Sequence, residues 1–222
     1  MNVAVRGGDD AVAAAVGVSG ASLVPEDGER PIDTVVAVGA DAIRSAVSDP
    51  PDAPVLPVTV DGGRHLVARD TLDGALATLV AGDGTRRSHS VVGVRRDGRV
   101  VARAVRDVAL VTAAPASISE FAITAGDRGL GSVRADGVVV ATPLGSDGYA
   151  AAAGGPVLEA GTGVSVVPVA PFSTAPDVRV VDPEAGLGLS VEREGDVALF
   201  VDGVRHGTVG AGTGVRVERV GR

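Results

Sequence analysis

The segment ATPLGSDGYAAAAGGP, residues 141–156, joins a strand end, a turn and a helix within a short span. An apolar run predicts a strand at 137–142, and the alanines predict a helix at 147–153. Two glycines and a proline at 154–156 end this helix, because proline cannot continue one. Small side chains at the turn allow a ligand to approach free backbone N–H groups closely. The segment therefore predicts either a phosphate-binding turn or a plain strand-to-helix connection.

Few polar side chains accompany this turn, and they have distinct chemistry. Thr142 and Ser146 carry hydroxyls, and Asp147 carries a carboxylate. Tyr149 is the only tyrosine of the chain, and its ring offers a flat face for a base or a ribose. The alternative for Tyr149 is a helix residue that packs against the sheet.

Strands and helices alternate in the first part of the chain. This alternation predicts a small Rossmann-like α/β domain at 1–85, with a parallel sheet and ligands at the carboxyl ends of its strands. The predicted strands are 2–5, 33–39 and 53–60, and the predicted helices are 9–18, 40–47 and 68–82.

Short alternating runs dominate the rest of the chain. At 90–112, two such runs are joined by RRDGR, which indicates a hairpin. Many strands separated by turns predict a β-rich sandwich domain at 86–222. Further predicted strands are 118–124, 130–134, 137–142, 163–169, 177–181, 187–192, 197–201 and 214–220.

The composition limits the partners of the protein. The 222-residue chain has a net charge of −8, and its 20 basic residues are all arginine. An acidic, lysine-free chain is typical of salt-adapted organisms, because salt screens repulsion between carboxylates. The absence of a basic stripe argues against nucleic-acid binding. With no cysteine, no signal peptide and no long apolar run, we expect a soluble cytoplasmic protein without membrane contact, disulfides or a residue-bound metal.

Three Gly/Asp loops could bind phosphate. RGGDDAV at 6–12 is interpreted as a turn with an acidic helix N-cap. AGDGTRR at 81–87 follows a helix and is interpreted as a helix end and linker. VGADAI at 38–43 follows the most apolar strand, so Asp41 stands where a carboxylate can hold a hydroxyl or a metal beside phosphates. A helix N-cap is an equally good account of Asp41.

A longer segment, RADGVVVATPLGSDGYAAAAGGPVL at 134–158, resembles the signature of the NAD kinases. The resemblance covers most of 130–222, including VSVVPVAPFSTAPDVRVV and the final VDG, and the first half only loosely. The matching residues are Asp136, Gly137, Thr142, Pro143, Gly145, Ser146, Tyr149, Ala153, Gly154, Gly155 and Pro156.

The resemblance implies a fold and a reaction. Members have an α/β nucleotide-binding half and a β-sandwich half, which is the architecture expected above. They transfer a phosphoryl group from ATP, or in some members polyphosphate, to the adenosine 2′-hydroxyl of NAD, with Mg²⁺ or another divalent cation. They are usually dimers or tetramers. With its acidic composition, the chain resembles a divergent, haloarchaeal-type member.

The resemblance also implies site residues. The Gly-Gly-Asp-Gly-Thr loop of the family falls on 39–43, which implies that Asp41 is catalytic and that Ala42 contacts the cofactor. The Asn-acid pair that holds the second ribose or the amide of NAD falls on Arg106 and Asp107. Other implied cofactor-binding residues are Arg134, Asp136, Thr142, Ser146, Asp147, Gly148, Tyr149, Ala152 and Ala170. For Asp136 a plain Asp-Gly turn is the alternative, and for Asp107 a surface acid.

Several positions depart from the family pattern. In the loop at 39–43 only the first glycine and the aspartate are kept, and Arg106 replaces the asparagine. Asp147 and Gly148 replace a Thr-Ala pair. These changes support an alternative, in which the protein is a non-catalytic or altered-substrate dinucleotide-binding or regulatory protein on the same scaffold. A lipid kinase of the related superfamily fits less well, because it would lack the 134–158 signature.

Overall fold

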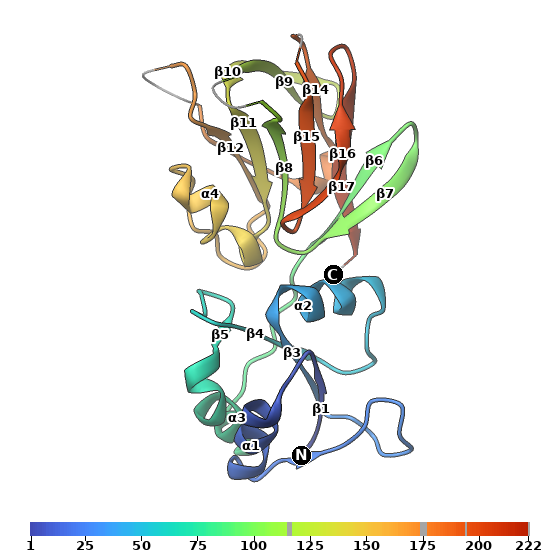
Figure 1. Cartoon of the computed structure of the whole chain (residues 1–222), viewed down its shortest axis with the longest axis vertical. Coiled ribbons are helices and arrows are strands. Elements are labelled where there is room, and N and C mark those ends of the chain that lie inside the picture. Colours follow the sequence, from blue (N-terminus) through green and yellow to red (C-terminus); the bar gives the residue numbers. More distant parts are fainter. Residues whose placement is uncertain (115–116, 174–176, 194, 222) are drawn as a thin grey trace. The chain divides into compact units, whose positions relative to one another are not determined.

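The computed structural model describes residues 1–114, 117–173, 177–193 and 195–221. The chain forms two compact units, Met1–Arg87 and Ser88–Arg222, here called the N-terminal and the C-terminal unit (Figure 1). No helix in the described ranges is long and apolar enough to cross a membrane.

The N-terminal unit is built on a parallel sheet of five strands in the order β2-β1-β3-β4-β5. This arrangement confirms the predicted α/β half. The strands are β1 (Asn2–Arg6), β2 (Ser22–Leu23), β3 (Thr34–Val38), β4 (Val55–Thr59) and β5 (Val67–Ala68). The helices are α1 (Asp10–Val18), α2 (Gly39–Ser48), the 3₁₀ turn η1 (Arg69–Thr71) and α3 (Leu72–Val80).

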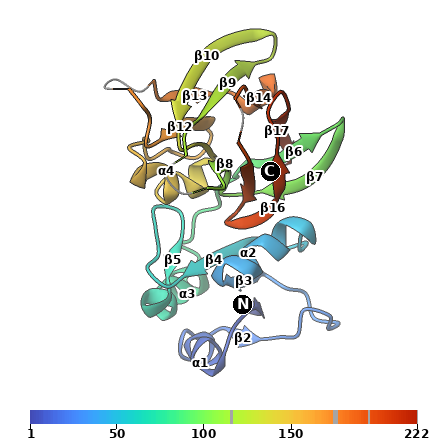
Figure 2. The same ribbon diagram turned by 45° about the horizontal axis from the view of Figure 1, so that its top comes forward.

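Helices cover both faces of this sheet. Every residue of β3 is buried, as its unbroken apolar run predicts for a strand covered on both sides. Helices α1 and α3 pack side by side on one face, and α2 lies on the other (Figures 1 and 2). Val12, Val16, Leu72 and Leu76 of the helices form one cluster with valines of β1, β3 and β4.

The sequence prediction missed or misplaced some elements here. Strands β2 and β5 have two residues each and lie at the sheet edges, where too few residues alternate to give a pattern. The helix predicted at 68–82 is shorter, because Ala68 belongs to β5 and η1 precedes α3.

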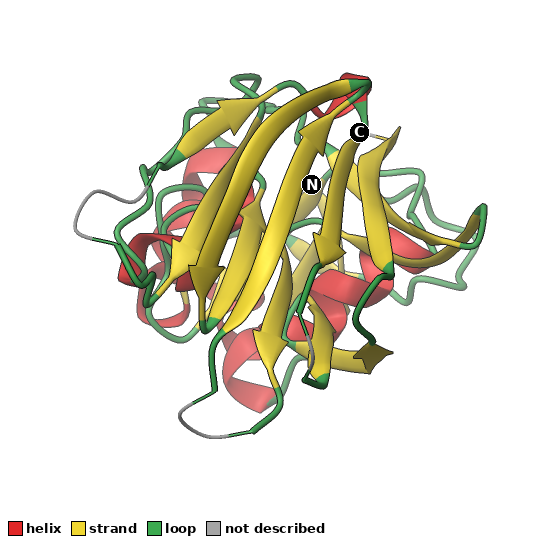
Figure 3. Cartoon of the chain, turned by 90° about the horizontal axis from the view of Figure 1, so that it is seen from above, coloured by secondary structure: helices red, strands yellow, loops and turns green. Residues whose placement is uncertain are grey.

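Two six-stranded antiparallel sheets form the C-terminal unit, with orders β10-β9-β14-β17-β6-β7 and β13-β12-β11-β8-β15-β16. Their strands lie side by side in Figure 3. A large apolar cluster from both sheets, including Phe121, Leu110 and Leu189, is buried between them, which confirms the predicted sandwich. The strands are β6 (Val91–Arg96), β7 (Arg99–Ala104), β8 (Asp107–Thr112), β9 (Ser119–Ala125), β10 (Arg128–Ala135), β11 (Gly137–Ala141), β12 (Val164–Val169), β13 (Arg179–Val181), β14 (Leu187–Val191), β15 (Val197–Val201), β16 (Val204–Val209) and β17 (Gly214–Gly221), with the 3₁₀ turn η3 (Pro183–Ala185).

The two runs predicted at 90–112 form three strands. The hairpin at Asp97 and Gly98 joins β6 to β7 as predicted, but β8 pairs in the other sheet. The break lies at Val105 and Arg106, whose N–H groups point to the carboxylate of Asp202 instead of a neighbouring strand. This contact joins residues far apart in sequence, so the run itself carries no sign of it.

Two further corrections concern the C-terminal unit. The helix predicted at 147–153 is a single turn, α4 (Tyr149–Ala152), preceded by the 3₁₀ turn η2 (Pro143–Gly145). Gly148 occupies the N-cap with φ −94° and ψ −123°, so the helix cannot begin earlier. Strand β16 was not predicted.

Candidate functional site

The N-terminal unit has a ligand-binding edge defined by its strand order. In the order β2-β1-β3-β4-β5 the direction of winding reverses between β1 and β3. In open α/β sheets, ligands bind at such a reversal, outside the carboxyl ends of the strands. The loop that follows β1 starts at Gly7, whereas β3 leads directly into α2 at Gly39. A Cβ atom on Gly7 would lie 2.6 Å from the carbonyl oxygen of Val38 and 3.0 Å from Cβ of Ala42, so this loop touches the start of α2.

Asp41 lies in the first turn of α2, directly after β3. Its side chain is 93% exposed and forms an ion pair with Arg44 one turn along the helix. The N-cap position is taken by Val38, without a side-chain hydrogen bond, so Asp41 is not the N-cap. The N-cap alternative is therefore wrong, and the carboxylate stands at the helix N-terminus. Ala42, beside it, is buried.

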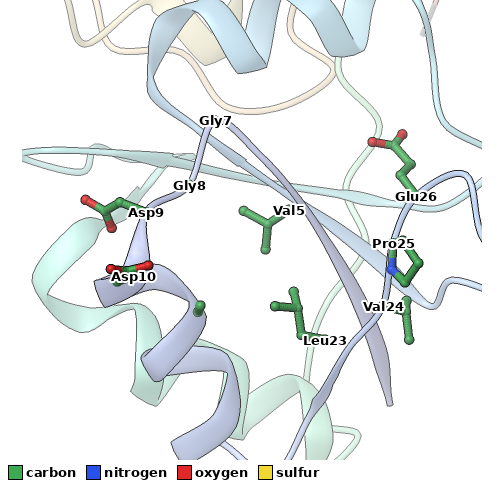
Figure 4. Close-up of a pocket in the computed structure, with 10 residues that line it drawn as sticks. Val5, Gly7, Gly8, Asp9, Asp10, Leu23, Val24, Pro25 and Glu26 are labelled. Carbon is green, nitrogen blue, oxygen red and sulfur yellow. The ribbon is translucent and has the colours of Figure 1, made fainter.

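The first Gly/Asp loop caps a helix, as predicted. Asp9 accepts a hydrogen bond from the N–H of Val12 (3.2 Å) and forms an ion pair with Arg69. The same loop also lines a cavity of about 650 Å³ at the carboxyl end of β1. Its lining residues are Val5, Gly7, Gly8, Asp9, Asp10, Ala13, Leu23, Val24, Pro25 and Glu26 (Figure 4). The predicted N-cap accounts for Asp9 but not for this cavity, which the position of Gly7 and Gly8 directly after the first strand could have indicated.

The third Gly/Asp loop ends α3. Gly82 adopts φ +84° and donates its N–H to Leu79, which is a helix-ending geometry. No helix or strand follows until Val91.

In the C-terminal unit, the turn of the 134–158 segment packs on the chain between β7 and β8. Thr142 donates its N–H to the carbonyl of Arg106 (2.8 Å) and its hydroxyl to the carbonyl of Val105. A Cβ atom on Gly145 would lie 2.7 Å from Cα of Arg106, so only glycine fits there. The turn therefore fixes the backbone that carries Arg106 and Asp107.

The side chain of Arg106 lies over this turn. A Cβ atom on Gly148 would lie 3.1 Å from its Nη2 atom. Its Nε atom is buried and has no hydrogen-bond partner among the described residues. A buried guanidinium N–H without a partner is rare and indicates a group that a ligand or water completes. The geometry thus leaves a cationic donor beside the turn.

Asp107 and Tyr149 form the electrostatic centre of the candidate site. Burial, reinforced by the charge of Asp202 and opposed by Arg106, raises the pKa of Asp107 to about 6. Burial also raises the pKa of the Tyr149 phenol, with smaller effects from Asp136 and Asp107. The tyrosine, 42% exposed, therefore lies near two carboxylates. Packing of α4 against the sheet uses Ala150 and leaves much of the Tyr149 side chain exposed.

Thr142 and Ser146 are fully buried. The hydroxyl of Ser146 donates to the carbonyl of Pro143 (2.9 Å) and accepts from the N–H of Leu158 (2.8 Å). Both hydroxyls therefore hold the turn together from inside. Of the other predicted residues in this segment, Asp147 and Gly148 are half-buried and Ala152 is exposed.

Three more predicted residues lie around the start of β11. Asp136 is half-buried between β10 and β11, and its N–H donates to Val169 (3.0 Å). Ala170, directly after β12, is exposed and has φ +44°, which is a strained backbone conformation for alanine. Arg134 lies 5.6 Å from the ring centroid of Phe172, in a cation–π contact. Phe172 is 72% exposed, and the prediction did not include it.

The candidate residues thus fall into two sets, each within one unit. Asp41 and Ala42 belong to the N-terminal unit, and the other predicted residues belong to the C-terminal unit. Among the residues that the structure describes, no group of three or more His, Cys, Asp or Glu could hold a metal ion.

Comparison with known proteins gives a family match. Residues 105–221 match the model of the ATP-NAD kinase C-terminal domain. The NAD kinase of Methanosarcina barkeri is 33% identical over 186 residues, which are 79% of this chain and 66% of that protein. The NAD kinase of Methanosarcina mazei is 31% identical over 201 residues, which are 87% and 68% of the two chains. The chain spans about two thirds of the length of these relatives.

Solved structures share the fold. A crystal structure of an NAD kinase from Archaeoglobus fulgidus in complex with ATP has a TM-score of 0.72 and 22% identity, covering 99% of this chain and 90% of that one. Yeast NADH kinase complexed with NADH has a TM-score of 0.74 and 17% identity, with coverage of 99% and 80%. At these identities the likeness establishes the architecture alone.

Proposed function

The chain belongs to the NAD kinase family, and we propose that it transfers the γ-phosphoryl group of ATP to the adenosine 2′-hydroxyl of NAD, giving NADP. The observation that carries this proposal is the family match over 105–221 together with an exposed aspartate at the end of β3. In this assignment the N-terminal domain, 1–85, provides the catalytic carboxylate, and the C-terminal domain, 86–222, binds the dinucleotide.

Asp41 is the proposed general base, or the group that orients the attacking hydroxyl. A catalytic carboxylate must reach its substrate, and Asp41 is 93% exposed at the carboxyl end of a strand. The N-terminus of α2 has no side-chain cap, so its first N–H groups are available to phosphate oxygens. Ala42 would contact the cofactor only through its backbone, because its side chain is buried.

The dinucleotide contacts fall on the exposed and half-buried residues of the C-terminal unit. Arg106 and Asp107 would hold the ribose or amide of the nicotinamide half, and Tyr149 would lie against a ring. Thr142 and Ser146 act indirectly in this proposal, because their buried hydroxyls hold the turn. The remaining proposed contacts are Arg134, Asp136, Asp147, Gly148, Ala152 and Ala170.

The residues present are compatible with magnesium bound through the nucleotide. Mg²⁺ usually keeps several waters and binds one or two carboxylates together with substrate phosphates, so it needs no cluster of protein ligands. Asp41 offers an exposed carboxylate for this at the edge of the sheet. When bound, the ion would offset the charge of the phosphates during transfer.

Formation of NADP tests the proposal. The purified protein is incubated with NAD, ATP and MgCl₂ in high salt, and NADP is measured with an NADP-specific dehydrogenase. Asp41→Asn keeps the size of the side chain and removes its basicity, so we expect a rate loss of at least about 100-fold. Equal NADP formation by both proteins would show that Asp41 is not the base, and polyphosphate in place of ATP tests the donor.

The altered loop supports a second candidate function. Ala40, Ala42 and Ile43 stand where the family has two glycines and a threonine, and Arg106 replaces an asparagine. An added Cβ can keep backbone from phosphate, so the protein could bind dinucleotide without transferring phosphate. Binding of NAD without formation of NADP would favour this function.

A cytoplasmic location, a dimeric or tetrameric state and a haloarchaeal-type adaptation to salt stay predictions.

A further inference from the structure

The turn between β15 and β16 holds a buried aspartate that the proposed reaction does not use. Asp202 is 8% exposed and stands in an Asp-Gly turn with φ +47°, followed by Gly203 with φ +78°. Aspartate tolerates this left-handed conformation, and Asp-Gly is a preferred pair for two-residue hairpins. The turn accounts for an aspartate at this place, but not for its burial.

The carboxylate of Asp202 binds the backbone of the segment that carries Arg106 and Asp107. Its Oδ1 atom accepts hydrogen bonds from the N–H groups of Arg106 (2.8 Å) and Asp107 (3.0 Å). Its Oδ2 atom accepts from the N–H of Val105 (3.0 Å). The N–H of Asp202 in turn donates to the carbonyl of Asp107 (2.9 Å). Hydrogen bonds to a charged acceptor are stronger than neutral ones, so this contact fixes the segment firmly.

From these contacts we propose that Asp202 is a positioning residue for dinucleotide binding, which fixes the Val105–Asp107 backbone so that Arg106 and Asp107 face the nicotinamide half of the ligand. The inference rests on the proposed function, because it assumes that this segment binds the dinucleotide. Thr142 and Gly145 hold the segment through Val105 and Arg106, and Asp202 holds it through the N–H groups of all three residues.

The charge of Asp202 gives a readout that a purely structural role would lack. The charged groups that face Asp107 are Asp202 from the β15–β16 turn, Arg106 from its own segment and Tyr149 from α4. With its pKa raised to about 6, Asp107 is protonated below that pH and ionised above it. A ligand hydroxyl or amide donates to the ionised form, so NAD affinity should rise as the pH passes through about 6. Removal of the Asp202 charge should lower the pKa of Asp107 and move this rise to lower pH.

The test compares two aspartates in equivalent turns. Asp202→Asn keeps a residue suited to the turn, but loses the charge and one acceptor oxygen. Asp97→Asn is the matched control, because Asp97 also precedes glycine in a two-residue hairpin with φ +50°, yet is exposed. NAD affinity is measured by titration calorimetry from about pH 5 to about pH 8, a range in which the NAD diphosphate does not titrate but Asp107 does. Thermal unfolding checks that each variant folds.

We expect Asp202→Asn to weaken NAD binding by on the order of tenfold near pH 8, as displaced binding groups do, and to shift the pH midpoint downward. Asp97→Asn should change neither the affinity for NAD nor the pH midpoint. Wild-type affinity and midpoint in Asp202→Asn would overturn the inference. If that variant does not fold, Asp202→Glu decides, because it keeps the charge but displaces the carboxylate from the N–H groups of the segment: weakened NAD binding supports the inference, and wild-type affinity overturns it. Failure of the wild-type protein to bind NAD at any pH would instead overturn the proposed function, and the inference with it.

Discussion

The turn at 142–148 and the first turn of α2 at 39–43 both follow a buried strand, yet different constraints act on them. At Gly145 the backbone of Arg106 leaves no room for a Cβ atom, and the hydroxyls of the turn are used internally. At Gly39 nothing lies within 4 Å of the Cβ position, and Asp41 is almost fully exposed. The family signature is thus kept where packing demands small residues. The signature therefore identifies the scaffold, whereas the exposed Asp41 at the start of α2 bears on the chemistry.

The largest effect that this comparison predicts is for Gly145→Ala. The new methyl group would meet the Arg106 backbone, which cannot move aside as a flexible side chain could. Overpacking of this kind destabilises by roughly 1–3 kcal/mol, measured by urea unfolding. Gly129→Ala is the control, because nothing lies within 4 Å of its Cβ position and its φ is not left-handed. Equal stability of both variants would mean that the turn is not held by packing.

Much of this scaffold could be predicted from the sequence because its signals are local. Alternating strands and helices indicated the parallel sheet. The small residues of the turn were expected to admit a ligand, whereas at Gly145 they admit the backbone of Arg106. The contacts of Asp202 could not be predicted, because they join residues 95 to 97 positions apart. For the same reason β8 was merged with β7. In the candidate site, Asp41 and Tyr149 were identifiable from motifs, but the burial of Thr142 and Ser146 depends on tertiary packing.

A smaller effect is expected in the first turn of α2 in the N-terminal unit. Ala42→Gly restores a family glycine, but removes a buried methyl group that packs near Gly7. We expect a loss of stability of about 0.5–1 kcal/mol, the usual difference between alanine and glycine in a helix. The KM for ATP should fall, because the backbone can approach phosphate more closely. Ala46→Gly is the control for helix propensity, since Ala46 lies in the same helix but outside residues 39–43. An unchanged KM would mean that Ala42 does not obstruct the nucleotide.

The smallest effect on stability is expected for Tyr149→Ala. This variant tests whether the signature segment also binds the ligand or only maintains the scaffold. The helix is anchored by Ala150, whereas the tyrosine side chain is 42% exposed, so its removal should change stability by within about 0.5 kcal/mol. Loss of a ring that stacks on a base or lies against a ribose should weaken NAD binding by roughly 1–3 kcal/mol, judged from base stacking on aromatic side chains. Tyr149→Phe separates the ring from the hydroxyl and should retain most of the affinity. If Tyr149→Ala instead lowers stability and leaves affinity unchanged, the tyrosine has a structural role like its neighbours, and the proposed contacts with the nicotinamide half are left to Arg106 and Asp107.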